Sequence, residues 1–178
     1  MSSSRSARLV SVALALALAG GCSSDPLPEG WVAASEESMR FAVPDTWVDT
    51  GELNERWTRS WQDVEGDDAR IQLAAAPEVG FYDAAMARSA LMATAQIGEM
   101  PGFAVVRYVD EDELGRSERE LTRTEFTYEP EDGTVYDGVL WTASADRQHH
   151  AVALQLTGPD LDPDLVAGIE ETLAVVVD

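Results

Sequence analysis

The sequence predicts an α+β protein in which an antiparallel β-sheet of about six to seven strands is covered by helices. Most of the chain after residue 38 consists of short segments in which apolar and polar residues alternate, as they do in strands. Two other segments carry apolar residues at helical spacing behind good capping residues. The resulting order is strands, a helix, a four-strand meander and a terminal helix, which is typical of the α+β class.

Three strands are predicted before the first helix. Met39–Val43 alternates and ends at Pro44, which restricts the residue before it to extended backbone. Glu55–Val64 and Ala69–Ala75 have the composition of two further strands. The acidic segment Glu65–Asp68 between them is typical of a hairpin loop.

The period then changes to that of a helix over Asp83–Ile97, with Asp83 as N-cap and Gly98 as C-cap. At the far end of the chain, Asp162 precedes Pro163, and proline favours the first position of a helix that we expect to run to about Ala174. Four strands are predicted between the helices, over Phe103–Val109, Glu118–Tyr128, Val135–Ala145 and Arg147–Thr157.

The N-terminus resembles a bacterial lipoprotein signal peptide. Arg5 and Arg8 precede the apolar run Leu9–Ala19, and two glycines then lead to Cys22, the single cysteine of the chain. A run of 11 residues spans about 16 Å as a helix, roughly half of a bilayer core, so it is a signal sequence and not a membrane anchor. Lipidation of Cys22 also removes a reactive free thiol from an exported protein. The alternative is an ordinary secretory signal cleaved near Ala19.

These features predict three segments: a signal peptide over residues 1–21, a lipidated N-terminus and tether over 22–30, and one domain over 31–178. The localisation predicted is the extracytoplasmic face of the cell membrane, reached through the lipid on Cys22. After cleavage, ten arginines and no lysine face 33 acidic residues, a formal net charge of −23. That charge argues against nucleic-acid partners and against the domain lying flat on anionic lipids.

Several features together resemble the PsbP-type fold, which includes the LpqN-type lipoproteins of actinobacteria. They are the segment Phe41–Trp47 with its Pro44, the helix Asp83–Ile97, the turn Met100–Phe103 and the long meander. The resemblance implies a non-enzymatic adaptor or ligand-binding role at the cell envelope, with an envelope protein, a glycan or a lipid as partner. Since the family has no shared catalytic residues, the resemblance implies no site residue.

One candidate ligand site is the trio Trp57, Arg59 and Trp61. Alternate residues of a strand share a face, so a guanidinium between two indoles could form a cation–π platform for a sugar, lipid or peptide. The alternative, which we favour, is that both indoles belong to the core and that Arg59 pairs with a carboxylate near an edge. The polar residues on the opposite parity, Arg56, Thr58, Ser60 and Gln62, are expected to face water.

The remaining candidates are weaker. Asp160, Asp162, Asp164 and Glu171 have EF-hand-like spacing, but Leu165 stands where the loop needs glycine, so a helix cap is the better explanation. His149 and His150 are adjacent in a strand and point to opposite faces, and the acidic run Asp110–Glu113 is typical of a solvated loop. No cofactor is predicted. The alternative to a binding role is a carboxylate-dependent hydrolase of envelope polymers, which requires two acids in a concave, partly apolar pocket.

Overall fold

The computed structural model describes residues 27–110, 120–130, 133–144 and 150–176. Its helical elements are α1 (Ala84–Thr94), the π-helical turn η1 (Ala95–Glu99) and α3 (Pro163–Thr172). Its strands are β1 (Trp31–Glu36), β2 (Met39–Pro44), β3 (Val48–Gly51), β4 (Arg59–Gln62), β5 (Gln72–Phe81), β6 (Ala104–Val109), β7 (Glu120–Tyr128), β8 (Tyr136–Ser144), β9 (His150–Gly158) and β10 (Ala174–Val175).

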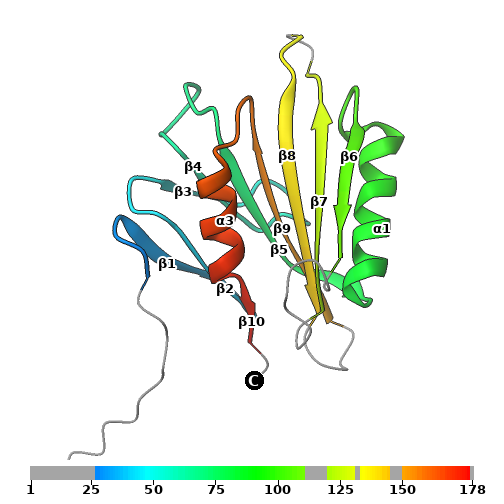
Figure 1. The fold of residues 1–178 in the computed structure, drawn as a ribbon, viewed down its shortest axis with the longest axis horizontal. Helices are drawn as coiled ribbons and strands as arrows, with labels where there is room; N and C mark the ends of the chain where they lie inside the picture. The colour runs from blue at the N-terminus through cyan, green and yellow to red at the C-terminus, as the bar shows by residue number, and fades with distance from the viewer. Residues whose placement is uncertain (1–26, 111–119, 131–132, 145–149, 177–178) are drawn as a thin grey trace, which may run out of the picture.

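Seven strands form one antiparallel sheet in the order β3-β4-β5-β9-β8-β7-β6, with β6 as one terminal strand. A second sheet of three strands has the order β1-β2-β10. Figure 1 shows that α3 lies beside the small sheet, whereas α1 lies at the β6 end of the large sheet. The prediction of an α+β fold with an antiparallel sheet covered by helices is therefore confirmed.

Two hydrophobic clusters occupy the two faces of the large sheet. The first, which we call the α3-side cluster, contains Trp141 and Leu154 from the sheet, Ile169 from α3 and Phe41 from β2. The second, which we call the α1-side cluster, contains Leu140 and Ala153 from the same two central strands, together with Leu91 and Met92 from α1. Because neighbouring residues of one strand fall in different clusters, the sheet is buried on both faces by different elements.

The N-cap predictions are confirmed at both helices. Asp83 Oδ1 accepts a hydrogen bond of 2.7 Å from the backbone of Met86, and Asp162 Oδ1 accepts one of 2.9 Å from Asp164. The prediction of Gly98 as C-cap was wrong by two residues, because the first helix continues into a π-type turn that is capped by Met100 and contains Gly98 with φ of 131°. Glycine adopts this conformation without steric strain, which explains why the helical spacing stops there.

The predicted strand Glu55–Val64 is wrong in its first half, because regular pairing in this region is confined to Arg59–Gln62. The side chain of Asn54 accepts hydrogen bonds from the backbone of Arg56 and Trp57, at 3.0 and 3.1 Å. An asparagine that bonds the backbone two and three residues ahead builds a turn, which competes with an extended strand. The strands β1, β3 and β10 have no counterpart among the predicted elements.

Candidate functional site

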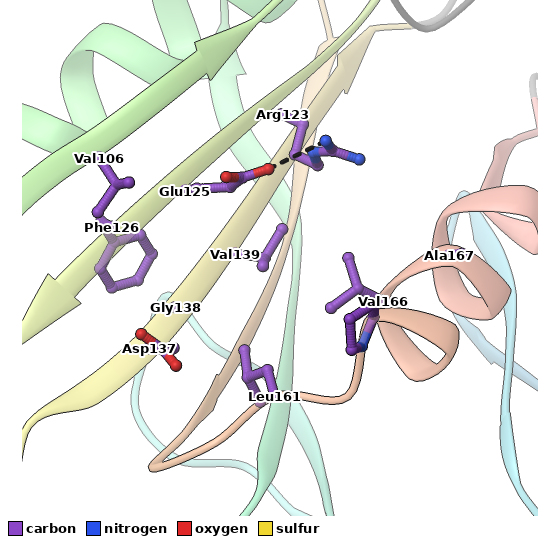
Figure 2. A pocket seen from close by; sticks show the side chains of 11 residues that line it. Val106, Arg123, Glu125, Phe126, Asp137, Gly138, Val139, Leu161, Val166 and Ala167 are labelled. Atoms are coloured by element: carbon purple, nitrogen blue, oxygen red, sulfur yellow. Dashed lines mark ion pairs between the residues drawn. The ribbon is translucent and has the colours of Figure 1, made fainter.

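A groove on the α3 face of the large sheet is the candidate site, and we call it the α3 groove. Its volume is about 350 Å³. Figure 2 shows Val139 from β8 facing Leu161 and Val166, which lie before and on α3. The groove is lined by Val106, Arg123, Glu125, Phe126, Asp137, Gly138, Val139, Leu161, Pro163, Val166 and Ala167.

Strand register explains why charged side chains line this groove. Glu125 of β7 lies opposite Val139 of β8, and Arg123 lies opposite Trp141. Val139 and Trp141 both belong to the α3-side cluster, so Arg123 and Glu125 point to the same face. Asp137 precedes Val139 by two residues and shares that face as well.

A β-bulge turns the terminal strand β6 toward the groove. The register steps from Val105 opposite Phe126 directly to Arg107 opposite Glu125, which leaves Val106 as the extra residue. A bulge of this kind redirects the side chains that follow it. Val106 consequently lines the groove while it remains 64% exposed.

Arg123 is the centre of an ionic network beside the groove. Its guanidinium contacts Glu125 at 3.0 Å and Glu170 of α3 at 3.0 Å. The same Glu170 oxygen accepts a hydrogen bond of 2.8 Å from the indole N–H of the buried Trp141. The network joins α3 to β7 and β8. Charge-assisted hydrogen bonds at partly buried positions hold such an arrangement more firmly than exposed pairs do.

Asp137 differs from the other acids of the groove. Glu125 is held by Arg123, whereas the Asp137 side chain is exposed and has no hydrogen-bond or ion-pair partner within the described part of the chain. Figure 2 shows Arg123 and Asp137 apart from each other, with Glu125 and Val139 between them. The groove therefore has an internally neutralised end and an end with one unpaired carboxylate.

The predicted trio is not brought to one face. Trp57 is 9% exposed and belongs to the α1-side cluster, whereas Trp61 is 5% exposed and belongs to the α3-side cluster. The expectation that Trp57 shares a face with Arg59 and Trp61 was wrong, because the turn at Asn54 interrupts the strand before Arg59. Ser60, expected to face water, is also buried, and it exchanges a 2.7 Å hydrogen bond with Thr50.

Arg59 lies where carboxylates reach it. Its Nε and Nη2 donate to one oxygen of Asp49 at 2.9 and 2.6 Å, and Nη1 lies 3.6 Å from Glu36. The hydrogen bonds from Arg59 lower the pKa of the Asp49 carboxyl below its ordinary value. The guanidinium also lies 5.6 Å from the ring centroid of Trp61, within cation–π range.

The calcium alternative is not formed. Asp162 caps α3, and no group of three metal-ligating side chains gathers anywhere among the residues that the structure describes. Such a group is therefore not formed by Asp160, Asp164 and Glu171. The helix that begins at Pro163 separates these acids, which an EF-hand loop would wrap around one ion.

Some of the other candidates lie outside the described residues, namely Cys22, His149 and residues 111–113. His150 packs against the exposed Phe81 with ring centroids 4.8 Å apart and an interplanar angle of 54°. Asp110 pairs with Arg88 at 2.6 Å. None of the described helices is long and apolar enough to span a membrane.

Arg123, Glu125, Asp137 and Glu170 are the residues that sequence reasoning missed. The available signal was a pair of opposite charges at alternate positions of a strand, Arg123 and Glu125, within the predicted segment Glu118–Tyr128. A charged pair on one face of a strand indicates either a solvated face or a polar groove. The third dimension was needed to choose, because α3 supplies the opposite wall and Glu170.

Comparison with solved structures identifies the fold. The structure is similar to the Ran-binding protein Mog1p of Saccharomyces cerevisiae, with TM-score 0.53 and 8% identity over 85% of this chain and 97% of Mog1p. It is similar to LpqN, involved in cell envelope biogenesis of Mycobacterium tuberculosis, with TM-score 0.52 and 16% identity over 78% of this chain and 83% of LpqN.

A third similar structure is cyanobacterial PsbP (CyanoP) from Synechocystis sp. PCC 6803, with TM-score 0.54 and 12% identity over 88% of this chain and 98% of CyanoP. The fold is therefore the PsbP/Mog1-like α+β fold. No protein-family model matches the sequence, and comparison with curated protein sequences gave no match.

Proposed function

We propose that this protein is a lipoprotein anchored through Cys22 to the extracytoplasmic face of the cell membrane, where the α3 groove serves as a non-enzymatic binding site of an envelope adaptor. The observation that carries the proposal is the groove itself, which combines apolar walls with charged side chains from two strands. Concave sites that mix apolar area with a few placed polar groups are typical of ligand recognition.

The fold supports this role. The similar proteins include one that binds Ran and one involved in cell envelope biogenesis. The signal-like segment before Cys22 and the short tether over residues 22–30 support membrane attachment. Nine extended residues reach at most about 30 Å, so the domain would stay close to the bilayer that holds the lipid.

Cell fractionation of Cys22→Ala tests the anchoring. The variant is expected to move from the membrane to the soluble extracytoplasmic fraction, since a diacyl group contributes about 0.8 kcal/mol for each buried methylene. Ser24→Ala, which keeps the cysteine, is the matched control and should stay in the membrane. Mass spectrometry of the wild type should find a diacylglyceryl group on an N-terminal Cys22, and an unlipidated chain that begins elsewhere contradicts the proposal.

One observation keeps the hydrolase as a second candidate. Glu125 and Asp137 line the same partly apolar groove, as the predicted carboxylate-dependent site requires. The ion pair between Glu125 and Arg123 favours a binding role, because that carboxylate is already engaged. Purified protein should therefore release no soluble sugar fragments from peptidoglycan. The opposite result has three parts: the wild type releases such fragments, Glu125→Gln and Asp137→Asn abolish the release, and Asp67→Asn in the β4–β5 loop retains it. Hydrolysis would then replace binding as the proposed function.

A further inference from the structure

The unpaired end of the α3 groove has the features of a site for a basic side chain. Asp137 of β8 lies opposite Gly158 of β9, and Leu161 fills the space that a side chain at Gly158 would take, since a Cβ there would lie 2.9 Å from Leu161 Cδ2. An exposed carboxylate thus lies beside an aliphatic wall made by Leu161, Val139 and Val166.

Lysine and arginine match this pair of surfaces, because their methylene stems cover apolar area while their heads remain charged. The other carboxylates near the groove are already held by cations. Arg123 pairs with Glu125 and Glu170, and Arg107 lies in register opposite Glu125 on the outer strand. A second cation is therefore best accommodated at Asp137, where the carboxylate has no partner among the described residues.

We propose that the α3 groove binds an extended, lysine- or arginine-bearing segment of a partner protein, with the basic head on Asp137 and its stem on Leu161 and Val166. This inference rests on the proposed binding function of the groove. The formal net charge of −21 for the whole chain would steer a basic partner toward the domain.

A protein segment fits the groove better than a free amine. An exposed ion pair alone changes affinity by about fivefold at most, so the amine by itself gives little binding. The residues on either side of the basic side chain supply the remaining binding free energy, because the apolar wall continues past Gly138 to the exposed Val106 on the terminal strand β6. A small amine would leave that part of the groove uncovered.

Fluorescence anisotropy tests the proposal with the full-length lipoprotein in neutral detergent. The probe is the peptide acetyl-Ser-Val-Lys-Val-Ser-amide, labelled with an uncharged dye. A second probe replaces its lysine by norleucine, which keeps the aliphatic stem and removes the charge. We expect the lysine peptide to bind the wild type about threefold to fivefold more tightly than the norleucine peptide.

The decisive variants form a double-mutant cycle. Asp137→Asn should abolish the preference for lysine and leave norleucine binding unchanged. Asp67→Asn, which removes the same charge from an exposed loop position, should keep the preference. Ala167→Trp should block both peptides by filling the groove from α3, whereas Ala90→Trp on the exposed side of α1 should block neither.

Each other result overturns a stated part of the proposal. Equal binding of the two peptides to the wild type, or an equal loss in Asp67→Asn, eliminates the specific basic site. If butylamine binds as tightly as the lysine peptide, the ligand of the groove is a small amine and not a protein segment. Peptide binding that survives Ala167→Trp, or no binding up to about 1 mM, removes the groove as the binding site and with it this part of the proposed function. Membrane attachment of Cys22 is measured separately and is unaffected by these outcomes.

Discussion

Replacement of Trp61 by alanine should show that the α3-side cluster holds the two sheets together. The indole is 5% exposed and packs edge-on against Phe41 of the small sheet, with ring centroids 5.1 Å apart and an interplanar angle of 89°. The same ring carries the Arg59 guanidinium on its face. Its removal therefore leaves a cavity at the contact between β4 and β2.

The expected cost follows from this burial. Tryptophan-to-alanine changes in a core lower the free energy of unfolding by about 3–5 kcal/mol, and an edge-on aromatic pair supplies about 0.5–1.5 kcal/mol of such a loss. For a domain of roughly 150 residues, each kcal/mol corresponds to about 2–4 °C of Tm. Trp61→Ala should therefore lower Tm by about 6–20 °C.

Circular dichroism melts and urea titrations of the purified protein measure this effect. Val64→Ala is the control, because Val64 is exposed in the β4–β5 loop and its truncation should change stability by about 0.5 kcal/mol or less. A Trp61→Ala melt within about 2 °C of wild type would refute the reasoning. It would mean that the indole is not part of the core, and the ligand platform would become the better interpretation.

The other predictions concern Gly138 and the Asp49–Arg59 pair. Gly138→Ala should lower the free energy of unfolding by about 1–3 kcal/mol or more, since its Cβ would overlap the buried Phe126 ring; partial recovery of the urea midpoint by Phe126→Leu in the same chain checks that cause. Arg59 lowers the pKa of Asp49, so this pair stabilises the protein above the ordinary aspartate pKa of about 4 and loses that effect as pH falls through the lowered value. Asp49→Asn should accordingly cost up to about 1 kcal/mol at pH 7 and almost nothing once wild-type Asp49 is protonated. A cost that is unchanged on acidification contradicts this assignment.

Local sequence patterns were enough to predict the fold class, both helix starts and the four strands β6 to β9, whereas β5 was predicted only as far as Ala75 and extends to Phe81. These features depend on local chemistry that one segment carries alone. Asp83 and Asp162 cap helices because a short carboxylate reaches the free backbone N–H groups just ahead of it. The alternation of β9 places Val152, Leu154 and Leu156 in one cluster because strand side chains have a period of two.

Other features depend on which elements meet, and they became visible only in the folded protein. Alternation predicted one face for Trp57 and Trp61. The backbone N–H groups of Arg56 and Trp57 instead donate to the Asn54 side chain and form a turn, and the two indoles lie in different clusters. The α3 groove is built from β7, β8 and α3, which are separate segments of the chain. The ion pair beside it joins Arg123 of β7 to Glu170 of α3 across 47 positions of sequence. No local pattern encodes such a contact, because it is set by the register of the sheet and by the place where α3 packs on it.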